Sequence, residues 1–420
     1  MPFDLSVPAI QFPLIGNSLA VAIPSLLHIV LAGLSVGFLV LAPIFEWRGR
    51  RAAHFTDLAY GLTKFTVLVF SVSTVLAVIM VELLIGLFPV TTMWIWNQFR
   101  GPIALAIAAF LLQFVFLYPY YHYWERIRRR SLGLHVTLGA AAALLMLIWV
   151  GVLDGMGSYM LTPVRGETTW NNLWNPTWLS LGLHRLIGEL AMAGYVIAAY
   201  GAWQVGRPNG QNKHDYYRFV IAIGWLGGFA ALVLQPFTGL VYASWIQRAA
   251  PDAYEQIIRG EYQFLALVQF SLLGLLMTGS HLLLNTTIPP ERRSRWLDMA
   301  IPATALLMIV SVGHTWLRRA FLYLLVVLLL WSVRSLFVRE GRRRLFAASF
   351  GPSMRPIALT LGVLALLIYL TMGTIRETAR RPYTVRHVIS LHDQVERPSA
   401  DGGNGKQREM PAYVTTERQE

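Results

Sequence analysis

Long apolar runs separated by short polar segments make up most of this 420-residue chain. Each run is about 20 residues long, the length that an α-helix needs to cross the hydrocarbon core of a bilayer. The pattern therefore predicts an all-α, polytopic transmembrane bundle of about nine or ten spans. The predicted spans are 18–45, 62–88, 102–124, 132–153, 178–204, 217–236, 263–285, 297–316, 320–338 and 356–375.

The exact count depends on the runs 297–316 and 320–338, because only the short segment His314–Arg319 lies between them. That segment is too short for a comfortable loop outside the membrane. Two tightly turned spans and one long kinked helix both fit this pattern.

Clusters of arginine indicate the orientation, because short loops rich in Lys and Arg stay on the cytoplasmic side. The clusters occupy alternate connections, which we expect to face inside: Arg48–Arg51, Arg126–Arg130, Arg207–Arg218, Arg292–Arg295 and Arg339–Arg344. The intervening connections are richer in Trp and Pro and are expected outside: 89–100, 154–178 and 236–262. The chain is thus predicted to be a multi-pass protein of the cell inner (plasma) membrane.

Composition narrows the possible functions. Charged residues are only 14% of the chain, and the net charge of +13 follows from the inside-facing loops, so nucleic acid is not an expected partner. The absence of cysteine excludes disulfides, Cys-ligated iron–sulfur clusters and covalently attached c-type haem. The N-terminus lacks the basic stretch and cleavage site of a signal peptide, so the first span is expected to be retained. We divide the chain into a membrane domain, 1–383, and a polar flexible tail, 384–420, on the outer side.

Four ionisable residues are predicted at the outer side of the spans: His28, His184, His314 and Glu377. An ionisable side chain costs about 2.5 to 3.5 kcal/mol at the bilayer centre on insertion scales, so each needs a partner or a role. Imidazole and carboxylate groups are suitable ligands for haem iron. Structural alternatives exist: a hydrogen bond to a neighbouring helix for His184, anchoring of a helix end for His314, and an ion pair with Arg380 or Arg381 for Glu377.

Short motifs spread along the chain carry a family resemblance. In order they are His28, Leu62-Thr-Lys-Phe65, Glu82-Leu-Leu-Ile-Gly86, Met160-Leu-Thr-Pro-Val164, Asn175-Pro176, Gln235-Pro236 and Glu377-Thr-Ala-Arg-Arg-Pro-Tyr383. Together they resemble subunit I of the cytochrome bd-type quinol oxidases.

The resemblance implies haem sites near the outer face. Glu377 and His28 are similar to the ligands of the paired high-spin haems, whose open iron faces suit oxygen chemistry, and His184 to an axial ligand of a low-spin haem b. The expected cofactors are one to three haems of type b, with haem d as an option for one of them. Arg165 and Arg380 are candidates for contacting haem carboxylates, because arginine forms charge-assisted bonds with them.

The coordination of the low-spin haem departs from the family pattern. The family's second axial ligand is a methionine in the seventh span, where this chain has leucine within Phe270–Gly274. Met277 and His314 are the candidates to replace it. Met277 also fits a packing role, since methionine fills irregular cores well.

Proton and quinol chemistry also depart from the family. The two glutamates of the family's third span are absent: the stretch around Ala106 is apolar, and Gln113 carries an amide. Thr238 and Ala243 stand where the family has the lysine and glutamate of its quinol site. Quinol oxidation releases protons and needs a base, for which Glu255 and Glu261 in the same outer region are candidates.

These observations predict a membrane haem-binding respiratory electron-transfer subunit that exchanges electrons with quinol, quinone or a partner protein. One alternative is a complete quinol:oxygen oxidoreductase subunit that reduces O₂ at a high-spin haem, with His28 and Glu377 as the catalytic ligands. A haem-free scaffold subunit is the other. By resemblance, the expected partner is a homologous second membrane subunit or a larger respiratory complex.

Overall fold

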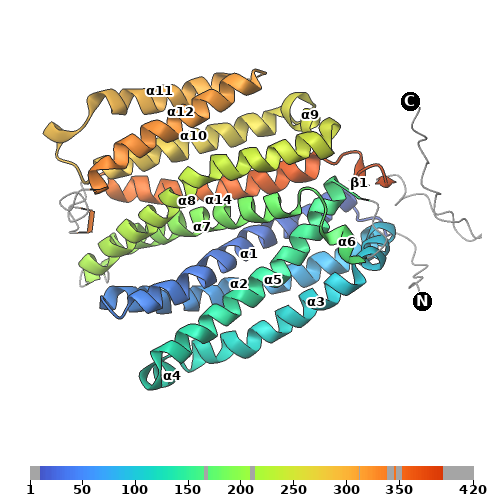
Figure 1. Cartoon of the computed structure of the whole chain (residues 1–420), viewed down its shortest axis with the longest axis horizontal. Coiled ribbons are helices and arrows are strands. Elements are labelled where there is room, and N and C mark those ends of the chain that lie inside the picture. Colours follow the sequence, from blue (N-terminus) through green and yellow to red (C-terminus); the bar gives the residue numbers. More distant parts are fainter. Residues whose placement is uncertain are drawn as a thin grey trace, which may run out of the picture.

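A computed structural model describes residues 10–164, 169–208, 213–311, 313–337, 345–346 and 352–390 (Figure 1). The described part is helical apart from one small hairpin. Its elements are α1 (Gly16–Arg48), α2 (Ala53–Leu87), α3 (Pro89–His122), α4 (Trp124–Arg130), α5 (Leu132–Leu161), α6 (Thr169–Leu173), α7 (Trp178–Val205), α8 (His214–Ala249), α9 (Pro251–Arg259), α10 (Gln263–Asn285), η2 (Pro290–Arg292), α11 (Arg295–Val310), α12 (Thr315–Ser332), η3 (Val333–Phe337), α14 (Met354–Thr378), β1 (Tyr383–Val385) and β2 (Ile389–Ser390).

Within the described residues, nine helices are long and apolar enough to cross a membrane. The prediction of a polytopic helical membrane protein is thereby confirmed. The additional predicted run is α11, a helix of 16 residues that packs against α10 and α12 at the edge of the bundle (Figure 1). A turn joins α11 to α12, and Gly313 has a φ of 85° in it, a conformation that favours glycine. The two runs are therefore separate helices, and the single kinked helix is excluded.

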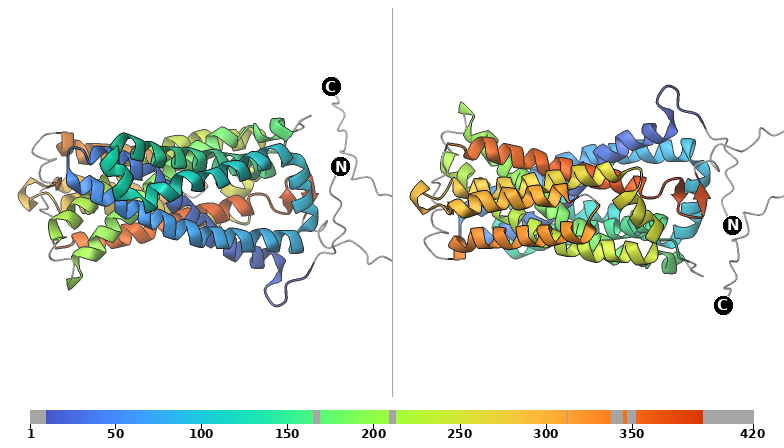
Figure 2. Two further views of the ribbon diagram at one scale, coloured as in Figure 1. Left: turned by 90° about the horizontal axis from the view of Figure 1, so that it is seen from below. Right: turned by 90° about the horizontal axis from the view of Figure 1, so that it is seen from above.

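The helices form an elongated bundle whose connections gather at its two ends (Figures 1 and 2). The arginine-rich α4 lies at one end, and α6, α9 and β1 lie at the other. We call these the inner and the outer end, following the predicted distribution of basic loops. Of those clusters, all of Arg339–Arg344 lies outside the described residues.

Several helices continue beyond the predicted spans. The predicted outer loop 236–262 is wrong, because α8 passes through Pro236 to Ala249 and α9 follows at once. Proline was expected to end the helix, since it removes one backbone N–H and crowds the preceding turn. Here the hydroxyl of Thr238 donates to the Gln235 carbonyl at 3.1 Å, and the hydroxyl of Tyr323 donates to the Pro236 carbonyl at 3.3 Å. These two side-chain hydrogen bonds add contacts to the helix next to the proline.

A buried polar contact fastens the inner half of the bundle. His135 Nδ1 lies 2.7 Å from Glu46 Oε1, and its Nε2 donates to the Tyr120 carbonyl at 3.0 Å. Both side chains are fully buried. The partner of His135 lies on α1, 89 residues away along the chain, so the contact joins α1 to α5.

Folded backbone continues past residue 383, where the sequence analysis ended the membrane domain. Strands β1 and β2 pair antiparallel, and Val385 and Ile389 are buried against Trp94, Phe99 and Tyr159. The apolar side chains of this hairpin thus cap the outer end of the bundle through Ser390. The rest of the predicted tail, 391–420, lies outside the described residues.

Candidate functional site

His28 lies on α1, twelve residues after Gly16 and so about 18 Å along the helix. Its Nδ1 lies 2.9 Å from the backbone carbonyl of Ser73 on α2. A carbonyl oxygen only accepts, so Nδ1 must carry the hydrogen. In the neutral imidazole this leaves the lone pair on Nε2, the atom that is then able to bind a metal.

His184 lies near the outer end of α7, and its ring faces α8. Its Nδ1 lies 3.2 Å from the hydroxyl oxygen of Thr238. The hydroxyl hydrogen of Thr238 is already donated to the Gln235 carbonyl, so the threonine oxygen accepts from Nδ1–H. The Gln235 amide in turn donates to the His184 carbonyl at 2.9 Å. His184 is therefore also held with the lone pair on Nε2.

The surface of α8 is shaped to fit this imidazole. A Cβ atom at Gly239 would lie only 3.1 Å from His184 Cε1, so glycine leaves the ring the room it occupies. One turn further along, the ring of Tyr242 stacks on the imidazole at 6.0 Å between centroids. Gln235, Thr238 and Tyr242 are spaced by three and four residues, which places them on one face of α8.

A buried cluster of charges lies beside the two histidines. Arg185 on α7 contacts Asp154 on α5, and its Nε donates to Glu189 Oε1 at 2.8 Å. The hydroxyl of Tyr369 on α14 donates to the same Glu189 oxygen at 3.0 Å. The side chains of Asp154 and Glu189 are 4% and 1% exposed. Glu189 therefore forms a buried ion pair with Arg185.

Glu377 lies at the outer end of α14, and its side chain is 57% exposed. It forms an ion pair with Arg380, which also donates to the Thr384 carbonyl. The structure therefore shows the ion-pair alternative for this carboxylate. A role as an iron ligand would require Glu377 to share or leave this contact.

Three of the four ionisable candidates converge at the outer half of the bundle. Arg185 interacts electrostatically with His28, and the ring of Tyr242 is stacked on His184. Tyr242 also interacts electrostatically with Glu377. His28, His184 and Glu377 thus surround one group of polar side chains.

Other candidates lie apart from this group. Met277 is fully buried on α10, and Ser280, one turn deeper, bonds to Tyr195, which follows His184 by eleven residues. Counting about 1.5 Å per residue on both helices places Met277 about 12 Å deeper than His184. His314 is exposed on the turn between α11 and α12. Neither position favours coordination of the same iron as His184. Arg165 lies outside the described residues.

The third span agrees with the sequence in lacking a buried carboxylate. Ala106 and Gln113 both face the interior of the bundle. The Gln113 side-chain oxygen accepts from the indole N–H of Trp149 at 2.7 Å. An amide does not titrate near neutral pH, so this position holds a hydrogen bond and no exchangeable proton.

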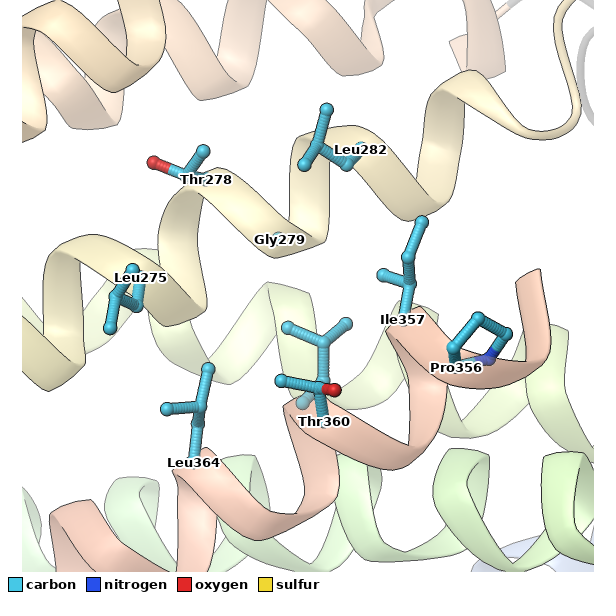
Figure 3. A pocket seen from close by; sticks show the side chains of 9 residues that line it. Leu275, Thr278, Gly279, Leu282, Pro356, Ile357, Thr360 and Leu364 are labelled. Carbon is cyan, nitrogen blue, oxygen red and sulfur yellow. The ribbon is translucent and has the colours of Figure 1, made fainter. Parts of the chain in front are cut away.

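An open groove of about 320 Å³ lies elsewhere, between α10 and α14. Figure 3 shows its mainly apolar lining, which includes Leu275, Leu282, Ile357 and Leu364. None of the candidate ligands lines it. Its position near the inner ends of both helices separates it from the group of polar side chains described above.

Sequence analysis missed the residues that orient the ligands. Ser73 and Tyr369 were not singled out, and Thr238 was considered only as a lost lysine. The spacing of Gln235, Thr238 and Tyr242 would have indicated a common face if α8 had been predicted to continue past Pro236. No comparable local signal pointed to Ser73, which lies 45 residues from His28.

Comparison with known proteins identifies the family. The family model for cytochrome bd terminal oxidase subunit I matches residues 18–275, which is more than half of the chain. The chain belongs to this family. The predicted resemblance is confirmed, and the protein is a multi-pass membrane subunit of the respiratory oxidase class. The match includes His28, His184 and Thr238 but ends before Glu377.

A solved structure supports the fold. The chain is similar to "The structure of bd oxidase from Geobacillus thermodenitrificans" with a TM-score of 0.63, at 16% sequence identity. The alignment covers 89% of this chain and 88% of that chain. No curated protein sequence matches.

The donor atoms of this chain fit the haem cofactor that a cytochrome family implies. The described residues contain no group of three or more His, Cys, Asp or Glu side chains able to hold a metal ion. A haem iron, by contrast, needs only one or two protein ligands. His28 and His184 each provide a free Nε2 on a ring whose Nδ1–H is anchored.

Proposed function

We propose that this chain is a membrane haem-binding electron-transfer subunit of a respiratory complex, which exchanges electrons with quinol, quinone or a partner protein. The two anchored histidines carry the proposal. Imidazoles that bind metals almost always donate their other N–H to an oxygen acceptor, which fixes the ring and its tautomer. Ser73 and Thr238 provide these acceptors for His28 and His184.

The haem supplies a reversible one-electron centre, and the residues around it determine where it sits. His184 would hold the haem iron through Nε2, with Thr238 behind the ring and Tyr242 stacked against it. His28 offers a second site through its own Nε2. By the predicted orientation both lie toward the outer side of the inner membrane. Haem b is the expected type, because the chain has no cysteine for covalent attachment.

A complete quinol:oxygen oxidoreductase is the second candidate function. His28 favours it, because a single protein ligand leaves one iron face open to a small molecule. Two observations place it second. Ala106 and Gln113 provide no proton in the third span, and Glu377 is engaged by Arg380.

The site of electron exchange is expected away from Thr238 and Ala243. Thr238 faces His184 and accepts its hydrogen bond, so its side chain is already committed. Glu255 on α9 is exposed beside Arg259, at 3.7 Å, and Glu261 is exposed next to α9. We propose that quinol or the partner approaches at this outer surface. A homologous membrane subunit or a larger respiratory complex is the proposed partner.

The test is the reduced-minus-oxidised optical spectrum of the purified protein with and without carbon monoxide, together with haem extraction. We expect a low-spin haem b that His184→Ala removes while the helical circular dichroism stays unchanged. His314→Ala is the matched control, because this imidazole is exposed on the turn between α11 and α12.

The possible spectra separate the candidate functions. A carbon-monoxide-sensitive component that disappears in His28→Ala would favour the oxidase over the electron-transfer subunit. A spectrum that His184→Ala does not change would refute the assignment of this ligand. A protein without any haem would refute the proposal and leave a scaffold.

A further inference from the structure

The buried charges beside His184 are not balanced. Asp154 and Glu189 share one guanidinium, that of Arg185. With all three groups ionised, this triad would carry one net negative charge inside a membrane-spanning bundle. Uncompensated charge in such surroundings is costly, and two carboxylates competing for one cation are a common way to retain a proton.

The groups that face Glu189 leave it without a second cation. On its own helix it contacts Arg185, and from α14 it receives the Tyr369 hydroxyl. On α1 the nearest approach is at Gly37, where a Cβ would lie 2.7 Å from the Glu189 carbonyl.

Further ionisable groups lie around the triad rather than on Glu189. His28 on α1 interacts with Arg185, and Tyr242 on α8 interacts with Asp154. Arg376 on α14 lies against Gly157, one turn from Asp154, and it also interacts with Glu377. Among the described residues, Arg376 thus lies near the outer carboxylates and interacts with Glu377. Glu189 lies one turn deeper on α7 than Arg185, and it shares the guanidinium of Arg185 with Asp154.

The triad is connected to both candidate haem ligands. Arg185 follows His184 directly in the chain and interacts electrostatically with His28. An electron arriving near these imidazoles makes the local potential more negative, and through a low dielectric this raises the affinity of a nearby carboxylate for a proton. Proton binding at the triad and electron transfer beside it are therefore coupled.

We propose that Glu189 is a redox-linked proton acceptor. Its carboxylate would bind one proton from the surrounding water, forming a carboxylic acid, when one electron from a quinol reaches a haem held by His184; the quinol would be left as a semiquinone and would release its own proton to the water at the outer surface. The proton is released when the electron leaves. This inference rests on the proposed function. Glu189 would then provide on α7 the titratable carboxyl group that α3 lacks at Ala106 and Gln113.

The experiment measures the haem midpoint potential against pH and the reduced-minus-oxidised infrared spectrum of the full-length protein in its native complex. In the wild type, the potential should fall as pH rises, because reduction takes up a proton. A protonated-carboxyl C=O band should appear on reduction and shift in D₂O. Glu189→Gln should lose both signals. Glu125→Gln should keep them, since Glu125 is exposed at the inner end.

The outcomes distinguish this inference from the proposed function. A wild type without haem refutes the proposed function itself. If Glu189→Gln contains haem and keeps both the pH dependence of the midpoint potential and the carboxyl band, only the role of Glu189 is refuted. Loss of the signals in Asp154→Asn, with retention in Glu189→Gln, would assign the proton to Asp154 instead. If Glu189→Gln does not assemble, Glu189→Asp must shift the band, and a wild type without the band overturns the inference.

Discussion

Thr238→Val tests whether the hydroxyl of Thr238 holds the His184 imidazole for haem binding. Valine has nearly the same shape as threonine, so the variant removes the hydrogen bond with little change in packing. The buried Nδ1–H of His184 then has no acceptor, and the ring can rotate or change tautomer.

The expected magnitude follows from the geometry. The Nδ1 to Oγ1 distance of 3.2 Å is at the long end for such a bond. Loss of an orienting partner typically lowers metal affinity 10- to 100-fold, so we expect the lower end, about tenfold or about 1.4 kcal/mol. Thr238→Ser keeps the hydroxyl and is expected to bind haem like the wild type.

The assay is haem affinity, measured by transfer of haem from the protein to apomyoglobin, with the low-spin spectrum recorded in parallel. Faster loss in Thr238→Val than in Thr238→Ser supports the argument. Equal affinity in wild type, Thr238→Val and Thr238→Ser, with His184→Ala still losing the haem, would show that the ring does not need this bond.

Three further variants test separate parts of the structure. Thr238→Lys combined with Ala243→Glu, which restores the family's residues, is expected to weaken the His184 haem and to give no gain in quinol turnover; a gain would show that the ancestral site survives. Glu377→Ala is expected to remove a high-spin haem component if this carboxylate leaves its ion pair to bind iron, and a spectrum that stays intact while assembly suffers would leave it a structural residue. Glu46→Gln is expected to lower stability by about 1 to 3 kcal/mol, because an amide replaces the buried carboxylate that lies 2.7 Å from His135 Nδ1 and weakens this contact. Thermal denaturation measures this loss, and a melting temperature equal to that of the wild type would contradict it.

The membrane helices were predictable because the bilayer imposes a strong local requirement: about 20 apolar residues per crossing, with no unpaired backbone. The connections were less predictable. Hydropathy reports where the hydrocarbon core ends, whereas α8 continues as a helix well past it, through Pro236. The β1–β2 hairpin was also missed, since the burial of Val385 depends on aromatic residues from α3 and α5.

The candidate site was likewise predictable only in part. The cost of an imidazole in a span drew attention to His28 and His184 without any knowledge of contacts. Their orienting partners were not predictable, because Ser73 and Thr238 lie 45 and 54 residues away and on other helices. The choice between a ligand role and an ion pair for Glu377 likewise depends on where Arg380 points.

A proton on Glu189 would explain both departures from the family pattern, the one at Thr238 and the one in the third span. A lysine at 238 would place a cation beside His184, where Arg185 already supplies one that two carboxylates share. Threonine instead provides a neutral acceptor that orients the ring. The charge that responds to an electron is then concentrated in the triad, of which Arg185 and Glu189 lie within two turns of His184 on α7 and Asp154 lies on α5. Under this arrangement, proton uptake no longer depends on a carboxylate in α3, so Gln113→Glu should leave the pH dependence of the haem potential unchanged while Glu189→Gln abolishes it.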